Sequence, residues 1–275
     1  MTNLVTTQWL ADHLHKDSLV ILDASWHLPT AKRDARAEFL VGHVPGARFF
    51  DLDQVSKQNT SLPHMLPTPE SFAASMRALG INDSSHVIAY DSVGLFSAAR
   101  CWWMFKIFGH KSVSVLDGGL RKWVAEGRAT QSGEVQMRPA GNFTAHLKGS
   151  MIRSMIQVSE GGAQVVDARS PTRFRGEEAE PRPGVKPGHI PGAKNLHYAS
   201  LLHADGTLQP PAELAERFAS AGIDLQKPII TSCGSGVTAA ILSLALTGLG
   251  TKNHALYDGS WAEWGASGRE IVLRT

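Results

Sequence analysis

The chain contains few cysteines, because Cys101 and Cys233 are the only two among its 275 residues. Two thiols can form at most one bridge, which excludes the disulfide framework that stabilises small secreted proteins. The beginning of the sequence also has no basic segment followed by an apolar one, so we expect no secretory signal. Both absences favour a reducing, cytoplasmic setting.

An excess of either charge is absent as well. The 27 lysines and arginines nearly balance 25 aspartates and glutamates, which gives a formal net charge of +2. So small a bias favours neither nucleic acid nor a charged membrane surface as a partner. The longest apolar run, residues 239–249, is too short to cross a bilayer and predicts a buried helix. The 12 histidines show no tight metal-ligand spacing, so we expect no metal site.

What the sequence does contain is one long internal repeat. The motif GHVPGA at residues 42–47 returns as GHIPGA at residues 188–193, an offset of 146. Three further matches keep the same order at offsets of 144, 142 and 141, and they pair Asp23 with Asp167, Asp91 with Cys233 and Asp117 with Asp258. A period of about 140 residues is far too long for a solenoid and indicates two copies of one domain.

The repeat divides the chain into two domains of ordinary size. We expect the first domain at residues 1–135, a linker at residues 136–149 and the second domain at residues 150–275. The linker contains proline and glycine and shows little periodicity, which is typical of a connection. Each domain is long enough to bury a hydrophobic core of its own.

Short apolar runs alternate with segments of helical periodicity in both copies. The expected strands are residues 19–22, 87–90, 113–116, 165–166, 229–232 and 255–257. The expected helices are residues 69–79, 98–108, 211–221 and 237–249. This alternation predicts an α/β fold in which each domain has a mostly parallel sheet flanked by helices. Continuous apolar strands agree with a sheet that is covered on both faces.

Cys233 stands where such a sheet places its chemistry. It directly follows the expected strand at residues 229–232, and α/β sheets bind ligands beyond the carboxyl ends of their strands. Glycines after it let backbone N–H groups turn inward as an anion-binding nest, to which the start of the next helix adds further donors. Such a loop stabilises a thiolate, so we predict that Cys233 is a nucleophile rather than a packing residue. The loop residues expected to line a substrate are Gly234, Gly236, Val237 and Thr238.

The other candidate positions contrast with Cys233. Cys101 lies in an apolar helical segment, so we predict that it packs in the core. Asp91 occupies the position of Cys233 in the first copy, and a carboxylate cannot carry sulfur. The first domain is therefore predicted to be catalytically inactive.

Together these motifs resemble the tandem-domain rhodanese family over essentially the whole chain. The sequence CGSGVT at residues 233–238 resembles the 3-mercaptopyruvate sulfurtransferases of that family. Relatives that use thiosulfate usually carry two basic residues after the cysteine, where this chain has Gly234 and Ser235. The resemblance implies transfer of sulfur from 3-mercaptopyruvate through a Cys233 persulfide, with release of pyruvate. The acceptor would be cyanide or a thiol, such as that of thioredoxin, and no metal or organic cofactor is implied.

The resemblance also implies roles for residues outside the loop. Arg173 and Arg182 match the two substrate-binding arginines, and a guanidinium fork suits a carboxylate. Without the resemblance, two arginines in a glutamate-rich loop are more often a solvated surface. Asp53 and His64 match residues that form a relay with Ser235, which would polarise the substrate carbonyl or manage its proton. The alternative is that Asp53 and His64 only order a loop between the domains.

Other functions stay open at this point. A thiosulfate sulfurtransferase is the nearest alternative, although the uncharged loop disfavours it. A cysteine phosphatase would need an arginine six residues after the cysteine, where this chain has Ala239. A protein that only carries a persulfide or binds partner proteins is a third alternative. Nothing in the sequence demands an obligate dimer, so we expect a monomer.

Overall fold

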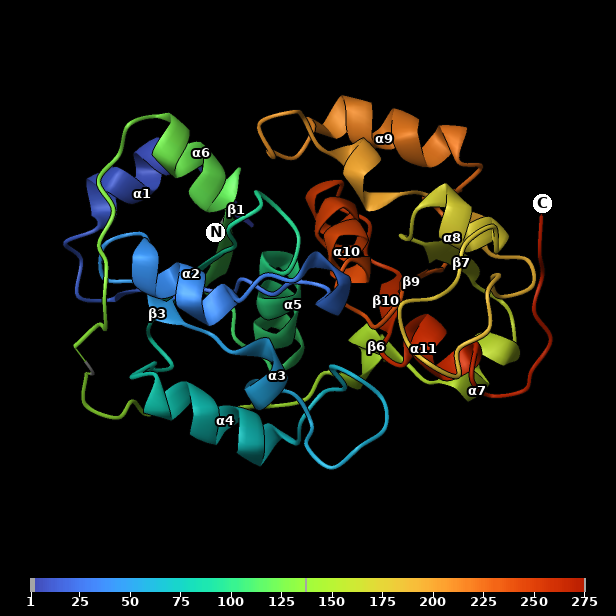
Figure 1. Cartoon of the computed structure of the whole chain (residues 1–275), viewed down its shortest axis with the longest axis horizontal. Coiled ribbons are helices and arrows are strands. Elements are labelled where there is room, and N and C mark those ends of the chain that lie inside the picture. The colour runs from blue at the N-terminus through green and yellow to red at the C-terminus, as the bar shows by residue number, and fades with distance from the viewer. Residues whose placement is uncertain (1–2, 137, 275) are drawn as a thin grey trace. The chain divides into compact units, whose positions relative to one another are not determined.

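The computed structural model describes residues 3–136 and 138–274. Met137, in the predicted linker, and residues 1, 2 and 275, at the ends of the predicted domains, lie outside the described residues. The chain forms two compact units (Figure 1). The first comprises Met1–Gln58, Leu66–Lys148 and Ala204–Leu208, and the second comprises Asn59–Met65, Gly149–His203 and Gln209–Thr275.

Each unit is built on a five-stranded parallel sheet, which confirms the predicted fold class. The strand order is β1-β5-β4-β2-β3 in the first unit and β6-β10-β9-β7-β8 in the second, so the two sheets have the same topology. Every strand pairing among the described residues is parallel. All five residues of β2 are buried, as expected for a strand covered on both faces.

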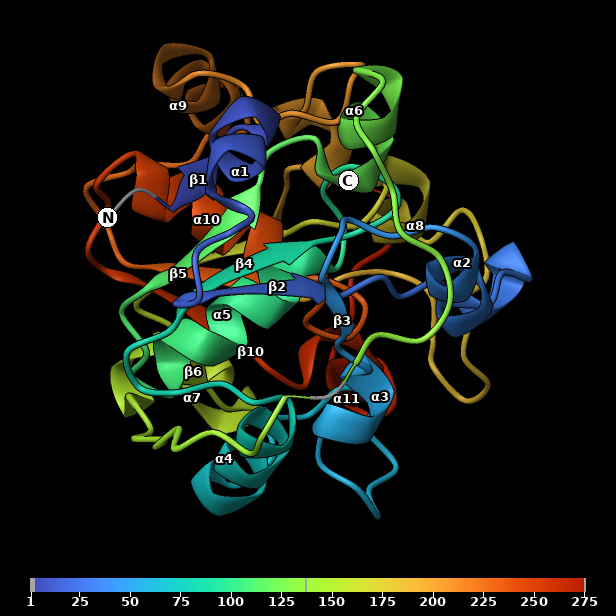
Figure 2. The ribbon, with the colours of Figure 1, turned by 90° about the vertical axis from the view of Figure 1, so that its left-hand side faces the viewer.

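The elements of the first unit follow the predicted alternation. Its strands are β1 Leu4–Val5, β2 Leu19–Asp23, β3 Arg48–Phe49, β4 His86–Tyr90 and β5 Val113–Leu116. Its helices are α1 Thr7–His13, α2 Ala35–Val41, α3 Leu52–Val55, α4 Pro69–Ala78, α5 Ala98–Ile107 and α6 Gly119–Ala125, with a 3-10 turn at Pro29–Ala31. Figure 2 shows α1 and α6 on one side of this sheet and α4 and α5 on the other.

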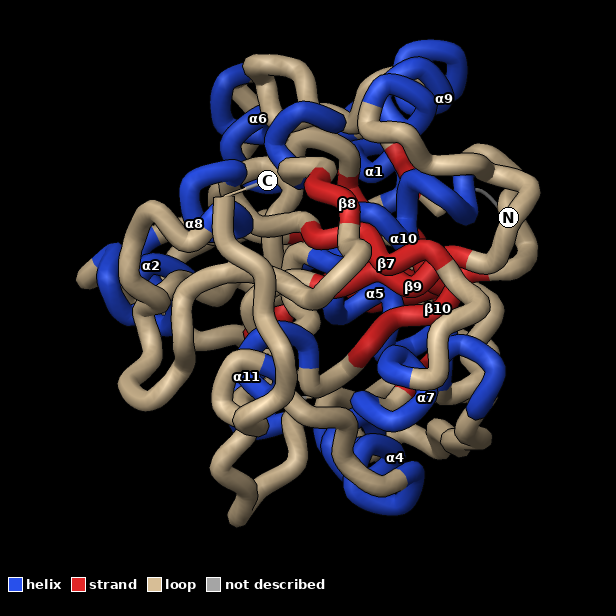
Figure 3. The backbone as a smooth tube through the Cα atoms, turned by 90° about the vertical axis from the view of Figure 1, so that its right-hand side faces the viewer, coloured by secondary structure: helices blue, strands red, loops and turns tan. Residues whose placement is uncertain are grey.

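The second unit repeats the arrangement. Its strands are β6 Ile152–Arg153, β7 Gln164–Asp167, β8 Lys194–Asn195, β9 Ile229–Ser232 and β10 His254–Tyr257. Its helices are α7 Met155–Ser159, α8 Pro171–Arg175, α9 Pro211–Ser220, α10 Ala239–Gly248 and α11 Ser260–Trp264, with 3-10 turns at Gly149–Met151 and Tyr198–Leu201. In Figure 3, α9 and α10 lie on one side of the strands, and α7 and α11 lie on the other.

Two details differ from the sequence-based expectation. The helix expected from residue 237 begins only at Ala239, because Val237 and Thr238 form a turn that belongs to the Cys233 loop. The expected linker is not a free connection, because its described residues up to 148 pack on the first unit. Phe143 in that segment is fully buried, and its N–H donates to the carbonyl of Ile81 at 3.2 Å.

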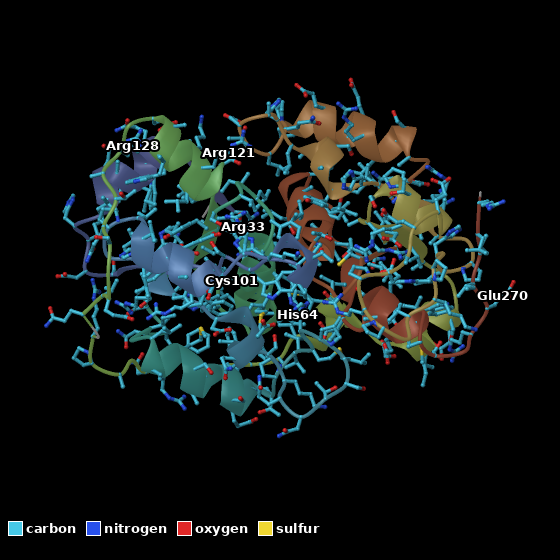
Figure 4. The ribbon with its side chains drawn as sticks, viewed as in Figure 1. Arg33, His64, Cys101, Arg121, Arg128 and Glu270 are labelled. Atoms are coloured by element: carbon cyan, nitrogen blue, oxygen red, sulfur yellow. The ribbon has the colours of Figure 1, made fainter. Side chains whose placement is uncertain are left out.

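Aromatic packing explains why this segment is held. Phe143 meets Phe105 edge to face with ring centroids 5.7 Å apart, and Phe72 stacks on Phe108 at 4.4 Å. Such rings remove much apolar surface from water. The same core contains Cys101, which is fully buried in α5 as predicted, and burial raises the pKa of its thiol (Figure 4). Cys101 is therefore unsuited to nucleophilic chemistry.

We expect His110 to make this core sensitive to acid. It is 6% exposed, lies next to the rings of Phe105 and Phe143, and has Nε2 2.9 Å from the carbonyl oxygen of Ser85. Burial lowers its pKa below 6.5, so the stability it contributes is present above about pH 6.5 and is lost as the pH falls through its folded-state pKa. We expect His110→Gln to flatten the loss of unfolding free energy, measured in urea, between about pH 7.5 and 5.5.

A matched control separates this effect from other histidines. His203 is exposed, so His203→Gln should leave the pH dependence of the unfolding free energy unchanged. If His110→Gln keeps the slope of the wild type, the burial of this imidazole is not a source of acid sensitivity.

Candidate active site

Cys233 is the first residue after β9 and is 2% exposed. Its neighbours Ser235 and Val237 are 4% and 3% exposed, so the loop is enclosed except at Gly234, which is partly exposed. Gly236 adopts a φ of +78°, a left-handed conformation that favours glycine. The loop thus turns sharply between the strand and α10, as the sequence predicts for an anion-binding nest.

The start of α11 holds the backbone of this loop. The N–H of Trp261 donates to the carbonyl of Cys233, and the N–H of Ala262 donates to that of Gly234, both at 2.9 Å. The hydroxyl of Ser260 accepts from the N–H of Cys233 at 3.2 Å and donates to the carbonyl of Tyr257. These bonds fix the carbonyls on the α11 side of the loop.

Three backbone N–H groups of the loop are available to bind a ligand. Within residues 3–136 and 138–274, no acceptor lies within hydrogen-bonding distance of the N–H groups of Ser235, Val237 and Thr238. Enclosed N–H groups without a protein acceptor are suited to an anion. The loop can therefore stabilise negative charge on sulfur attached to Cys233.

Ser235 is held by two side chains predicted from the sequence. Its Oγ lies 2.9 Å from Nδ1 of His64 and 3.4 Å from Nη2 of Arg182. Because a guanidinium only donates, Oγ accepts from Arg182, and its second lone pair can accept from Nδ1 of His64 when that nitrogen carries the proton. His64 is 5% exposed and has a φ of +57°, and it belongs to the segment Asn59–Met65 of the second unit (Figure 4).

Arg173 reaches the loop from α8. Its guanidinium is bound on one edge by Glu180, with Nη2 2.5 Å from Oε2 and Nε 3.2 Å from Oε1. A Cβ added to Gly234 would lie 3.1 Å from Nη2 of Arg173, so this guanidinium lies directly over the glycine. Arg173 and Arg182 therefore both approach the residues that follow Cys233.

Sequence reasoning missed the residues that hold Arg173. Arg169 is buried and binds Glu180 at 2.7 Å and both carboxylate oxygens of Asp167, while its guanidinium lies 4.5 Å from the ring centroid of Trp261. Burial acts to lower the pKa of Arg169, but Asp167 and Glu180 outweigh it and the pKa is raised. The available signal was the arginine in the Asp-Ala-Arg sequence that begins at the last residue of β7, because the first copy has Ser25 in its place.

Asp53 is placed differently from the other predicted residues. It lies in α3 of the first unit, where its carboxylate accepts a hydrogen bond from Nε1 of Trp26 at 3.2 Å. Its predicted role beside His64 stays a prediction.

The sequence of both units matches one family. The rhodanese-like domain is found at residues 6–126 and again at residues 154–267. The chain belongs to the rhodanese family. This confirms the predicted family and its tandem arrangement.

Characterised relatives of this rhodanese cover nearly its whole length. Human 3-mercaptopyruvate sulfurtransferase is 44% identical over 271 residues, which is 95% of this chain and 91% of the human protein. Thiosulfate/3-mercaptopyruvate sulfurtransferase 1, mitochondrial, of Arabidopsis thaliana is 42% identical over 285 residues, 95% of this chain and 75% of that protein. The crystal structure of SseA from Escherichia coli, described with the 3-mercaptopyruvate sulfotransferases, matches with a TM-score of 0.87 and 42% identity over 95% of this chain and 99% of SseA.

The first unit of this rhodanese has the same loop without a cysteine. Asp91 follows β4 and is fully buried, and its carboxylate accepts four backbone N–H groups. The donors are Val93, Gly94, Phe96 and Ala98, at 3.1, 3.1, 2.7 and 2.9 Å. In this unit the nest is thus filled by a side chain of the loop itself.

Two further properties concern the described part of the rhodanese. Its histidines, cysteines and carboxylates form no group of three or more that is placed to hold a metal ion. None of its helices is both long and apolar enough to cross a membrane.

Proposed function

We propose that this rhodanese is a 3-mercaptopyruvate sulfurtransferase. It moves sulfur through a persulfide of Cys233 to a thiophilic acceptor and releases pyruvate. One observation carries the proposal: Arg173 and Arg182 both reach the loop of Cys233. The residue after this cysteine, Gly234, has no side chain. The names of the human and Arabidopsis relatives support the same donor.

The donor is bound through its carboxylate and carbonyl oxygens. Arg173 and Arg182 offer N–H donors to these oxygens, and a planar guanidinium matches a carboxylate in geometry and charge. The Cys233 thiolate then attacks the donor sulfur, the carbon–sulfur bond breaks, and its electron pair leaves as the enolate of pyruvate. Donors that are already in place stabilise this developing charge without reorganisation.

The Asp91 loop indicates where the persulfide charge would be held. The outer sulfur of a cysteine persulfide is two bonds from Cβ, as are the carboxylate oxygens of an aspartate. The offset of 142 that relates Asp91 to Cys233 carries the four donor positions to Ser235, Gly236, Thr238 and Ala240. The N–H of Ala240 already donates to the carbonyl of Val237, whereas those of Ser235 and Thr238 have no acceptor among the described residues. We infer that the N–H groups of Ser235 and Thr238 receive the outer sulfur, and that the first domain, with Asp91 in this place, is catalytically inactive.

The relay is part of the proposal. In it, His64 and Asp53 orient the Ser235 hydroxyl, which donates to the substrate carbonyl and strengthens that bond as the enolate forms. We expect His64→Ala to lower kcat for 3-mercaptopyruvate by about 10- to 100-fold, measured as pyruvate release. Ser235→Ala should have a similar effect, and the double variant should be no worse than the single ones, because the two residues act as a unit. Unchanged turnover in His64→Ala would remove the relay.

The proposal also includes the sulfur acceptor, the cellular location and the oligomeric state. Cyanide serves in the assay, and a thiol such as that of thioredoxin is the proposed cellular acceptor. We also propose a cytoplasmic monomer, although one relative is named as mitochondrial. A dimer mass in sedimentation or fractionation with an organelle would contradict these two points.

The donor assay tests the function directly. Pyruvate release from 3-mercaptopyruvate, with cyanide as acceptor, is compared with thiocyanate formation from thiosulfate. We expect 3-mercaptopyruvate to be the better donor by kcat/KM, with weak activity on thiosulfate. Preference for thiosulfate would overturn the donor, and no turnover with either would favour a persulfide carrier or an interaction module.

A further inference from the structure

Glu180 joins the two arginines beside the cysteine loop. Its side chain is 4% exposed, which is rare for a carboxylate unless it is paired. Oε1 accepts from Nη1 of Arg169 at 2.7 Å and from Nε of Arg173 at 3.2 Å, while Oε2 accepts from Nη2 of Arg173 at 2.5 Å. One buried carboxylate thus holds two guanidinium groups.

The Arg169 end of this chain of ion pairs is fixed. Its side chain is 1% exposed, and Nη2 donates to Asp167 and to the carbonyl of Gly188, both at 2.7 Å. Its guanidinium also lies over the ring of Trp261, and the backbone N–H of Trp261 donates to the carbonyl of Cys233. Because Arg169 is anchored on several sides, it fixes the position of Glu180.

At the other end, Arg173 uses only part of its hydrogen-bond donors. Glu180 binds the edge formed by Nε and Nη2, and no acceptor among the described residues lies within hydrogen-bonding distance of Nη1. The Arg173 side chain is 16% exposed and lies against Gly234. Glu180 therefore turns the remaining donors of Arg173 toward the cysteine loop.

Two roles for Glu180 predict opposite results. If Glu180 only neutralised charge, its removal would leave more positive charge near Cys233 and strengthen the binding of an anionic donor. If it positions Arg173, its removal lets a flexible side chain leave the loop, and binding of the donor weakens. The bound edge of Arg173 and the rigid Arg169 behind it favour the second role.

We propose that Glu180 is a positioning residue that holds Arg173 for the carboxylate of the donor. The proposal rests on the proposed sulfurtransferase function. Glu180 touches no reacting atom, and it acts by fixing the guanidinium that does. It therefore determines the affinity for carboxylate-bearing donors more than the rate of the sulfur transfer step.

Kinetics of two variants distinguish the two roles. We expect Glu180→Gln to raise KM for 3-mercaptopyruvate by about 10-fold or more, with kcat within about threefold of the wild type. Glu180→Asp keeps the charge but shortens the side chain, so it should also raise KM. A KM that falls in Glu180→Gln and is unchanged in Glu180→Asp would overturn the proposal in favour of simple neutralisation.

A second readout does not depend on sulfur transfer. Iodoacetate and iodoacetamide alkylate the same thiol but only iodoacetate carries a carboxylate, so their rate ratio at Cys233 reports the positioned Arg173. We expect this ratio to fall by about threefold or more in both Glu180 variants. An unchanged alkylation ratio in the Glu180 variants would overturn the proposal. If the wild type does not turn over 3-mercaptopyruvate but the variants still have a reduced alkylation ratio, the proposed donor is wrong and the positioning role of Glu180 stands.

Glu178→Gln is the matched control. Glu178 lies in the same loop but is exposed, and it binds the hydroxyls of Ser170 and Thr172 rather than an arginine. Its KM and alkylation ratio should equal those of the wild type. If Glu180→Gln does not fold, Glu180→Asp carries the same two expectations. A Glu178→Gln variant that matched Glu180→Gln would overturn the specific role of Glu180.

Discussion

Replacing Cys233 by serine should abolish the release of pyruvate from 3-mercaptopyruvate, with a loss of more than about 1,000-fold. A hydroxyl does not attack a sulfur donor at neutral pH, so no persulfide forms. The substitution is nearly isosteric, and the backbone of residue 233 is held through Ser260 and Trp261 whatever its side chain. The loss should therefore come from chemistry rather than from unfolding. Mass spectrometry after donor treatment without acceptor should show one added sulfur on the wild type and none on the variant.

Cys101→Ser provides the control for this experiment. Cys101 is fully buried in α5 of the first unit, and burial raises the pKa of its thiol. The serine variant should lose some stability, because its hydroxyl would be buried without an assured partner. Its folded form should keep the turnover of the wild type. Residual persulfide in Cys233→Ser, or lost turnover in folded Cys101→Ser, would contradict the assignment of the nucleophile.

Gly234→Arg should have the second-largest effect. The φ of Gly234 is outside the left-handed region, so its backbone accepts a side chain. Space is the constraint, because a Cβ would lie 3.1 Å from Nη2 and 3.8 Å from Nη1 of Arg173. A full arginine would displace that guanidinium and repel it. We expect kcat/KM for 3-mercaptopyruvate to fall by about 100-fold, while the activity ratio shifts toward thiosulfate, a dianion that profits from charge beside the cysteine.

Gly248→Arg controls for the added charge. Gly248 is the last residue of α10, and a Cβ there would meet nothing within 4 Å. The extra cation near the carboxyl end of a helix should be tolerated, with both donors used as in the wild type. Equal effects of the two substitutions on the donors would show that net charge, not the displacement of Arg173, determines the preference.

The sequence predicts best where local chemistry and geometry coincide. The four repeated motifs predict two domains of one fold, and the parallel sheets and the family matches confirm the fold class and the family. Cys233 could be predicted as the nucleophile because a strand, a glycine-bearing loop and an apolar helix follow one another directly. The sequence predicts the start of α10 two residues too early, because Val237 is as apolar as the helix that follows.

Other features depend on residues that only meet in three dimensions. Glu180 lies in a segment so rich in charge that the sequence predicts a solvated surface, yet its carboxylate is buried between Arg169 and Arg173. The predicted linker has no periodicity, but Phe143 packs in an aromatic cluster of the first unit, and backbone hydrogen bonds to Arg77 and Ile81 hold the chain around it. His64 and Ser235 are 171 residues apart, and no local pattern indicates that their side chains share a hydrogen bond.

The sequence by itself therefore determined the duplicated α/β fold, the place of Cys233 at the end of a strand and the cysteine-free counterpart at Asp91. Each of these features follows from short stretches of sequence, because hydrophobic periodicity and turn-forming residues act over neighbouring positions. Only the tertiary structure decided which charged side chains leave water and face the loop. A buried ion pair such as Glu180 with Arg169 exists because the fold supplies an opposite charge at hydrogen-bonding distance to offset the loss of hydration, and sequence spacing does not encode that distance.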